Sequence, residues 1–509
     1  MKGNVAESLL AGLEALDTAR QDLPAGPVLN EVGTVSEVSR GVAAATGLAG
    51  VAAGEMVTLG RGALGLVSDV RRRDVGVVLL SGSREVRAGD DVRRTGQILE
   101  VPVGDALLGR VVNALGLPLD GAGELQAHGR LPVERPATLI SDRAPVTEPL
   151  QTGVKVIDTL FPVGRGQREL IIGDRQTGKT SIALTAILAQ RETGVLCVYC
   201  AIGKRGAEVA RTIATLGRAG ALDYTTVVVA PAEAEPGLRQ VAPFAAMSVA
   251  EAWMQAGRDV LVVLDDLVQH ARAHREVSLL LRRPPGREAY PGDVFYLHSR
   301  LLERATQLSE ARGGGSLTVL PIVETQERDL AAYIPTNLIS ITDGQIVLVP
   351  ELFRLGQLPA VDVGLSVSRV GGKAQLPAYS AVAGGLRLSH AQFEELEGFA
   401  RLGAELDSTT VATLERGARV REVFKQADLE PVPVVEQIVV LLATTAGLFD
   451  AVPADRIGDI ELALRREVPP ALPEVKARIE RGDALGEEDR ETLLGLARAV
   501  IEKARGSRS

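Results

Sequence analysis

The amino-acid sequence of 509 residues has few cysteines, few aromatic residues and no long apolar run. Its two cysteines exclude a disulfide framework, and their scarcity fits a reducing cytoplasm. Aromatic residues make up 3% of the chain, so small aliphatic side chains are expected to fill the cores. No apolar stretch reaches the roughly 18–20 residues of a membrane span, and the N-terminus shows no signal-peptide pattern. We therefore expect a soluble chain that can still dock on a membrane-bound assembly.

An excess of positive charge is also absent. The 56 basic and 65 acidic residues give a formal net charge of −9, whereas proteins that coat nucleic acid usually carry a basic excess. The 54 glycines and 26 prolines form no repeat, which excludes collagen-like and low-complexity chains. Charge and composition thus indicate a globular protein without a nucleic-acid partner.

Cys197 and Cys200 have the C-x-x-C spacing of metal and redox sites. They lie in the apolar stretch 195–200, however, which has the pattern of a buried strand. Residues three apart on a strand point to opposite faces of the sheet. We therefore interpret both cysteines as small apolar core residues.

The chain is too long for one core, and its pattern changes twice. Short β-rich runs give way to alternating strands and helices, and these give way to helices alone. The order predicts a multidomain α/β protein with a small β-barrel, a RecA-like P-loop domain and a helical domain. The predicted ranges are 1–28 for an N-terminal tail or helix, 29–100 for the barrel, 101–385 for the P-loop domain and 386–509 for the helical domain.

Five apolar stretches predict the buried strands of a mainly parallel sheet that helices cover on both faces. They are 170–172, 195–200, 227–229, 260–264 and 317–323. Further along, Ser389 and Gln392 have the spacing of a capping box, which predicts that a helix begins at Ser389.

The stretch 173–180 fits the phosphate-loop pattern G-x-x-x-x-G-K-[ST] and stands between a predicted strand and the predicted helix 181–190. Its glycines let backbone N–H groups surround phosphate oxygens, and the helix N-terminus adds positive potential. Lys179 is expected to reach the outer phosphates, and the Thr180 hydroxyl is expected to bind Mg²⁺. The residues expected to bind the nucleotide are Gly173, Asp174, Arg175, Gln176, Thr177, Gly178, Lys179 and Thr180.

A second anchor for the metal is expected where Asp265 and Asp266 follow the apolar stretch 260–264. In a Walker B segment such an acid lies across from the phosphate-loop hydroxyl, so Asp265 is expected to hold Mg²⁺ through water. Two acids after a strand could instead cap the next helix.

His270 and His274 have the i, i+4 spacing of a helical zinc pair. The residue after His270 is Ala271 rather than glutamate, so the base of a metalloprotease motif is missing. We interpret both histidines as surface or interface residues.

A base for ATP hydrolysis is not evident. Such a residue orients the attacking water and is usually a carboxylate or a glutamine. Its natural place, after the strand that contains the cysteines, is occupied by Lys204 and Arg205. An ammonium group is a poor base at neutral pH, so this loop is expected to hold a nucleotide rather than to hydrolyse it. Glu208 and Glu324 stay open as alternative bases.

Several long strings resemble the alpha subunits of F-type ATP synthases. They are the phosphate loop, the runs 279–305 and 324–346, and the string VGLSVSRVGG at 363–372. The resemblance implies a regulatory, non-catalytic subunit that binds Mg²⁺ with ATP or ADP. It also implies partners, namely beta subunits in an alternating alpha3beta3 hexamer, a central-stalk gamma subunit and peripheral-stalk subunits. The complex would couple ATP synthesis to H⁺ or Na⁺ transport on the cytoplasmic face of the cell membrane, and the chain alone is not expected to be active.

The resemblance further implies that Arg369 is an arginine finger in the catalytic site of the adjacent beta subunit. A guanidinium supplied in trans stabilises the charge on the transferred phosphoryl group. Ser366 and Ser340 match family positions near the same catalytic interface, and we count Ser366 among the candidate catalytic residues.

The adenine pocket of the family is matched only in part. Phe353, Pro359 and Gln426 agree with it, whereas Leu358 replaces an arginine and Asp428 replaces a glutamine. Loss of a guanidinium and an amide predicts weaker recognition of the base. With Lys204 at a position where the family usually has glutamine, these departures indicate a divergent alpha subunit, from an alternative or sodium-type enzyme.

Two other functions stay open. An autonomous homohexameric ring ATPase, like the flagellar and type III export motors or a helicase, shares this core but needs its own catalytic carboxylate near Lys204. A nucleotide-regulated scaffold differs only in that Arg369 contributes nothing to the chemistry of a neighbour.

Overall fold

The computed structural model describes residues 31–127, 129–401 and 408–506, which belong to two units, Met1–Ile98 and Leu99–Ser509. The tail or helix predicted for residues 1–28 lies outside the described residues. The barrel, the P-loop domain and the helical domain are all present in the predicted order, so the predicted fold class is confirmed. The exact domain boundaries stay predictions.

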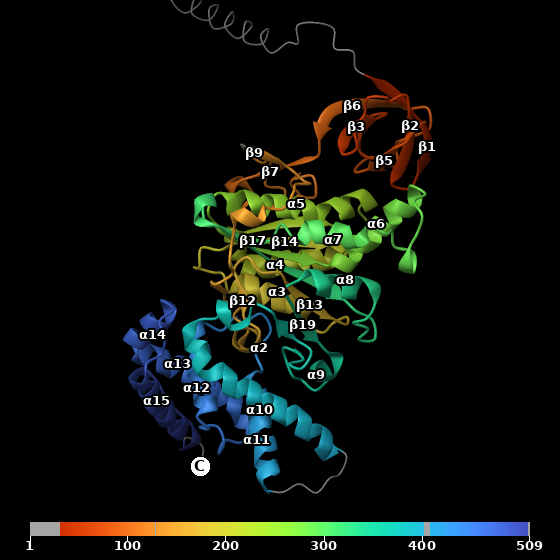
Figure 1. Ribbon diagram of the computed structural model, residues 1–509. Coiled ribbons are helices and arrows are strands. Elements are labelled where there is room, and N and C mark those ends of the chain that lie inside the picture. Colours follow the sequence, from red (N-terminus) through yellow and green to blue (C-terminus); the bar gives the residue numbers. More distant parts are fainter. Residues whose placement is uncertain (1–30, 128, 402–407, 507–509) are drawn as a thin grey trace, which may run out of the picture. The chain divides into compact units, whose positions relative to one another are not determined.

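The first unit contains a closed antiparallel barrel (Figure 1). Its strands are β1 (Val32–Ser39), β2 (Val42–Thr46), β3 (Glu55–Leu59), β4 (Ala63–Val70), β5 (Val75–Leu79) and β6 (Asp91–Ile98), in the spatial order β1-β2-β5-β4-β3-β6. Aliphatic side chains such as Val57, Leu59 and Leu79 fill the interior. Gly65 packs so closely against β5 that an added Cβ would lie 2.4 Å from Cγ1 of Val77. The barrel interior therefore tolerates no side chain at this position.

The second unit is built on a 10-stranded sheet, most of whose strand pairs are parallel. Along its main path the order is β20-β19-β13-β18-β16-β14-β15-β8. The strands on this path are β8 (Val111–Asn113), β13 (Glu169–Gly173), β14 (Leu196–Ile202), β15 (Thr225–Ala230), β16 (Asp259–Asp265), β18 (Ser316–Glu324), β19 (Gly344–Leu348) and β20 (Val367–Ser368). Off this path, β17 (Thr306–Leu308) pairs with β18, and β10 (Arg143–Ala144) pairs with β17. All five predicted strands are confirmed. Cys197 and Cys200 are free thiols fully buried in β14, as expected of core residues.

Helices cover both faces of this sheet, as expected for parallel strands with helical crossovers. Figure 1 shows α5 (Pro236–Gln255), α6 (Leu267–Leu280) and α7 (Val294–Leu302) on one side, and α3 (Lys179–Leu188) and α4 (Gly206–Arg218) on the other. Along the chain, α8 (Tyr333–Ile341) precedes β19 and α9 (Pro350–Arg354) follows it. Because all carboxyl ends of the parallel strands meet at one edge, the loops that follow β13, β14 and β16 converge there.

A fully buried ion pair joins α5 to the segment after α7. Arg304 contacts both oxygens of Glu251 at 2.7 and 2.9 Å, and Arg135 reaches the same carboxylate at 3.1 Å. The remaining N–H groups of Arg304 donate to the carbonyls of Val133 and Phe244 and to the hydroxyl of Ser248. The buried guanidinium is therefore completely satisfied, as a buried charge must be.

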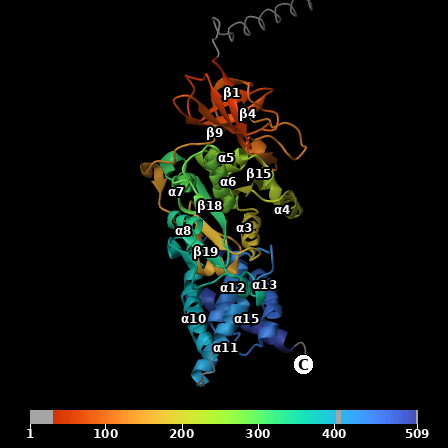
Figure 2. The ribbon, with the colours of Figure 1, turned by 90° about the vertical axis from the view of Figure 1, so that its right-hand side faces the viewer.

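The C-terminal part is helical. Figures 1 and 2 show its helices side by side, and α12 (Val434–Thr445) contacts α10 (Pro377–Arg401), α11 (Ser408–Val423), α13 (Ile457–Ala471), α14 (Pro473–Glu480) and α15 (Glu487–Gly506). Residues 437–444 of α12 are all buried, which is typical of a helix at the centre of a bundle. None of the helices in the described ranges is long and apolar enough to cross a membrane.

The predicted helix start at Ser389 is wrong. Helix α10 begins at Pro377 and continues through Ser389, so the capping-box pattern lies in its interior. Proline suits the first turn of a helix because its missing N–H is not needed there. Gly385 lies in the same helix, and a Cβ at this position would come within 3.2 Å of the Thr445 methyl of α12. Tertiary packing against α12 thus accounts for the glycine inside α10.

Candidate nucleotide-binding site

The phosphate loop lies at the carboxyl edge of the sheet, between β13 and α3. Gly178 has a φ of 95° and Gln176 a φ of 59°, and both values belong to the left-handed region that glycine adopts most easily. At Gly173 a Cβ would lie 2.4 Å from the carbonyl oxygen of Leu348 on β19, so no side chain fits there. The two glycines of the motif are therefore required by the backbone itself.

Lys179 is buried, and its ammonium group donates to the carbonyl oxygen of Asp174 within the loop. Burial lowers the pKa of Lys179, and the nearby carboxylates of Glu324 and Asp265 offset only part of that shift. The ammonium group is thus enclosed by the loop that is expected to surround the phosphates. A bound polyphosphate would supply the negative charge that this buried cation lacks.

Asp174 fastens the loop to its neighbours rather than pointing outward. Its carboxylate accepts from the Thr325 hydroxyl at 2.7 Å and from the Arg328 N–H at 3.0 Å. The Thr177 hydroxyl donates to the Asp174 carbonyl at 2.8 Å. Arg175 extends into solvent and pairs through Nε with Glu324 at 2.9 Å. Only part of the motif is thus presented to a ligand, and the rest holds the loop in shape.

The two acids after β16 have different roles. Asp265 is fully buried, and its Oδ2 accepts from the Thr180 hydroxyl at 2.8 Å, so the predicted juxtaposition of these residues is present. Asp266 accepts from the Gln269 N–H at 2.8 Å and caps α6. Burial raises the pKa of Asp266 to about 6. The capping interpretation therefore holds for Asp266, whereas the Walker B role of Asp265 toward Mg²⁺ stays a prediction.

Lys204 and Tyr199 complete the surroundings of Asp265, and sequence reasoning missed both contacts. The Tyr199 hydroxyl donates to Asp265 Oδ2 at 2.9 Å, and Lys204 Nζ lies 2.6 Å from Oδ1. Burial of Lys204 opposes its charge, but the carboxylates of Asp265 and Asp266 outweigh burial and raise its pKa. The signal that could have indicated these contacts is the strand register, because Ala201 of β14 pairs with Asp265 of β16.

The two alternative bases lie in different places. Glu324 ends β18 directly beside Gly173 of the phosphate loop, where it pairs with Arg175. Glu208 lies in the first turn of α4 and is exposed. By position Glu324 is nearer the loop, and its ion pair with Arg175 engages the carboxylate that a base would need.

The predicted adenine-binding residues lie close together around the turn after α9. Phe353 is half exposed on α9, and the Gln426 N–H donates to the Leu358 carbonyl at 2.8 Å. The side-chain amide of Gln426 is already used, since it donates to the carbonyls of Gly153 and Glu430 and accepts from the Lys155 N–H. The role of these residues toward a base stays a prediction.

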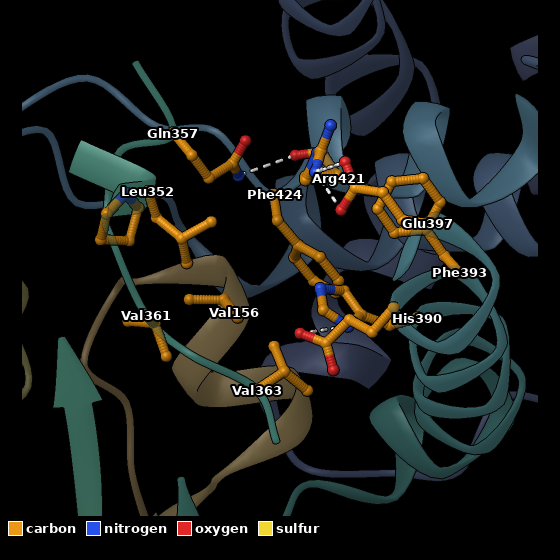
Figure 3. A pocket seen from close by; sticks show the side chains of 12 residues that line it. Val156, Leu352, Gln357, Val361, Val363, His390, Phe393, Glu397, Arg421 and Phe424 are labelled. Carbon is orange, nitrogen blue, oxygen red and sulfur yellow. Dashed lines mark hydrogen bonds and ion pairs between the residues drawn. The ribbon is translucent and has the colours of Figure 1, made fainter. Parts of the chain in front are cut away.

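Pro359 also lines a small cavity that sequence reasoning did not find (Figure 3). Figure 3 shows apolar side chains from the α9 region facing aromatic and charged side chains of the helical part. Arg421 bonds both oxygens of Glu397 at 3.3 Å and lies 4.6 Å above the centre of the Phe393 ring. The complete lining is Val156, Leu352, Gln357, Pro359, Val361, Val363, His390, Phe393, Glu394, Glu397, Arg421 and Phe424.

Arg369 follows the short edge strand β20, which pairs antiparallel with β19. Its side chain is exposed, and its Nη2 donates to the Ile339 carbonyl at 3.1 Å. No carboxylate in the described part of the chain pairs with it. Ser366, by contrast, is buried, donates to the Asp362 carbonyl and accepts from the Val347 N–H. The geometry thus presents Arg369 to the exterior, while the Ser366 hydroxyl supports the loop before it.

The interpretation of His270 and His274 as surface or interface residues is wrong, because both are buried within the chain. Both are buried on α6, together with His298 of α7, and the rings of His270 and His298 are 5.4 Å apart. His270 contacts the Gln240 carbonyl and His274 contacts Asp293, each at 2.9 Å. The described residues contain no set of three or more side chains arranged to hold a metal ion. Packing between α5, α6 and α7 therefore explains the i, i+4 spacing.

Because these histidines are buried, the free energy of unfolding of the chain is expected to fall at acidic pH. Burial lowers the pKa of His298 to about 3 and that of His270 well below its ordinary value of 6.5. As the pH falls below 6.5 only the unfolded chain takes up these protons, so the free energy of unfolding should fall by about 1.4 kcal/mol per pH unit for each histidine. Denaturant unfolding at pH 7.5, 6.0 and 5.0, followed by fluorescence of Trp253 on α5, measures this slope. A His298→Leu variant should show a shallower slope, and equal slopes would contradict the assignment.

Comparison with known proteins adds the following. Residues 153–368 match the model of the ATP synthase alpha/beta family, nucleotide-binding domain, residues 28–96 match its beta-barrel domain, and residues 375–500 match the ATP synthase alpha/beta chain, C terminal domain. The chain is 59% identical to ATP synthase subunit alpha 2 of Albidiferax ferrireducens over 92% of this chain and 88% of that protein. It is 56% identical to ATP synthase subunit alpha 1 of Shewanella frigidimarina over 92% and 91% of the two chains. It is 54% identical to ATP synthase subunit alpha 2 of Syntrophotalea carbinolica over 98% and 95%.

Proposed function

This chain belongs to the ATP synthase alpha/beta family as an alpha subunit, and from this premise we propose that it binds a nucleotide without hydrolysing it. The observation that carries the proposal is the environment of the phosphate loop. The Thr180 hydroxyl donates to Asp265 at 2.8 Å, which agrees with a nucleotide site, but Lys204 of the loop after β14 lies beside the same carboxylate. The site is thus equipped to hold phosphates, and it has an ammonium group where a water-orienting carboxylate is needed.

Magnesium fits the donors of this site. The Thr180 hydroxyl and the Asp265 carboxylate are hard oxygen ligands, which Mg²⁺ prefers, and they lie side by side at the start of α3. We propose that Thr180 binds the ion directly and that Asp265 holds it through water. A bound Mg²⁺ would neutralise charge on the outer phosphates of ATP or ADP.

The proposed role of Arg369 lies outside the chain's own site. Its exposed guanidinium, held by one contact to the Ile339 carbonyl, is free of carboxylates within the described ranges and is available to a neighbouring subunit. We propose that it stabilises the phosphoryl group in the catalytic site of an adjacent beta subunit. The corresponding assembly is an alternating alpha3beta3 hexamer with central and peripheral stalks, bound peripherally to the membrane sector that moves ions.

The alternative of an autonomous ring ATPase is not favoured, because the relatives described above are alpha subunits of ATP synthase. Such a motor also needs a base of its own. The Glu324 carboxylate is paired with Arg175, and the loop after β14 places Lys204, rather than a carboxylate, beside Asp265.

Replacement of Lys179 by methionine tests the nucleotide site. We expect the affinity of the full-length chain for ATP to fall by roughly a hundredfold, because a buried charge-assisted contact to phosphate is removed. Isothermal titration with ATP and Mg²⁺ measures the change. Lys503→Met is the matched control, since Lys503 lies exposed on α15 and pairs with Glu467. Equal affinities of the Lys179→Met variant and the original chain would contradict the proposal.

A further inference from the structure

Lys204 occupies one side of the carboxylate that is expected to hold the metal. Its Nζ lies 2.6 Å from Asp265 Oδ1, while the Thr180 and Tyr199 hydroxyls donate to Oδ2 at 2.8 and 2.9 Å. Asp265 is fully buried, and these three groups contact its carboxylate. Among them only Lys204 carries a positive charge. The Lys204 ammonium group thus already places a positive charge beside the carboxylate that is expected to hold the metal ion.

The backbone holds Lys204 in this position. The Gly203 N–H donates to the Ala230 carbonyl at 2.7 Å, and the Lys204 carbonyl accepts from the Ala232 N–H at 2.9 Å. Gly203 has a φ of 65°, and a Cβ there would lie 2.8 Å from the Gln269 side chain. The turn between β14 and α4 is therefore fixed before any ligand binds. Such preorganisation lowers the entropic cost of presenting the ammonium group to a ligand.

The site thereby contains two ammonium groups. Lys179 lies inside the phosphate loop, and Lys204 is near enough to act on it electrostatically. Lys204 remains partly accessible, with 20% of its side chain exposed, whereas Asp265 and Asp266 are covered. An accessible cation next to a buried carboxylate can turn toward an incoming anion and keep its contact with that carboxylate. A polyphosphate is the anion that the adjoining loop is shaped to hold.

We propose that the Lys204 ammonium group takes over part of the charge neutralisation that a divalent cation supplies, so that this site retains nucleotide polyphosphate even without Mg²⁺. The inference rests on the proposed nucleotide binding and adds a specific property to it. It differs from a purely structural role for Lys204, in which the ion pair would stabilise β14 and β16 and leave the metal dependence of binding unchanged.

The test compares ATP affinity of the full-length chain in excess Mg²⁺ and in excess EDTA. For the original chain we expect the affinity to fall by about tenfold or less when Mg²⁺ is removed. For Lys204→Gln we expect a fall of roughly a hundredfold or more, the size expected for loss of one partly buried charge contact. Lys204→Arg keeps the charge and should behave like the original chain. Arg205→Gln is the matched control, because it removes one positive charge from the adjacent, exposed position.

The outcomes separate the inference from the proposed function. Equal metal dependence of the original chain and Lys204→Gln would overturn the inference and leave nucleotide binding intact. A hundredfold loss of ATP affinity of the original chain in EDTA would also overturn the inference. This outcome needs no variant, so it can be tested even if Lys204→Gln failed to fold. Absence of ATP binding by the original chain in both conditions would overturn the proposed function as well. Circular dichroism of each variant reports whether it is folded.

Discussion

Replacement of Arg369 by alanine is expected to reduce steady-state ATP hydrolysis by the assembled hexamer by about 10³-fold or more. The reason is that a guanidinium supplied in trans stabilises charge that develops only in the transition state, so its loss lowers the rate rather than the affinity. Within this chain the Arg369 side chain is exposed and its Nη2 donates to the Ile339 carbonyl, so we expect its truncation to leave the fold almost untouched. Phosphate release by the hexamer formed with its beta-type partner measures the effect.

Two comparisons make the Arg369 experiment specific. Lys373→Ala removes a nearby exposed positive charge and should leave hydrolysis near normal. Arg369→Lys keeps the charge but not the planar fork, and it should recover only part of the rate. Gel filtration and ATP titration should show that assembly and nucleotide binding by this chain persist in Arg369→Ala. Near-normal hydrolysis by that variant would refute the arginine-finger assignment.

Replacement of Arg304 by methionine is expected to lower the free energy of unfolding by about 3–5 kcal/mol. The substitution removes both contacts to Glu251 and leaves a buried carboxylate with Arg135 as its remaining ion-pair partner. It also leaves the Ser248 hydroxyl and the Val133 carbonyl without a donor from this side chain. Since Trp253 is the only tryptophan and lies on the same helix as Glu251, its fluorescence during denaturant unfolding reports directly on this region.

An exposed arginine in an ion pair provides the control for Arg304. Arg312 pairs with Asp142 at 2.8 Å, and 60% of its side chain is exposed. Arg312→Ala should therefore change the free energy of unfolding by less than about 1 kcal/mol. A change of that small size in Arg304→Met would show that the Glu251 network contributes little to stability.

Much of the fold could be predicted because it depends on local patterns. The stretch 260–264 is apolar throughout, which is the pattern of a strand covered on both faces, and it became β16. The phosphate loop and Asp265 could be placed at one edge because parallel strands end together there, and the 2.8 Å contact with Thr180 agrees.

The remaining features depend on contacts between distant residues, which a single sequence does not contain. Nothing near Arg304 indicates that Glu251, far away in sequence, would neutralise it in the core. Lys204 was recognised as a poor base, but its contact with Asp265 required the pairing of β14 with β16. His270 and His274 were interpreted as surface or interface residues because their burial depends on α5 and α7 packing against α6. The start of α10 was misplaced because the capping-box spacing at Ser389 is a local pattern, and the helix passes through it from Pro377.

The most direct test of the account follows the fate of ATP bound to this chain alone. The purified full-length chain is incubated with Mg²⁺ and ATP labelled in the γ-phosphate, separated from free nucleotide, and its bound nucleotide is then recovered and identified. A chain that holds a nucleotide without a water-orienting base returns the label as intact ATP after hours. Recovery of the label as inorganic phosphate, with ADP left on the chain, would contradict the account.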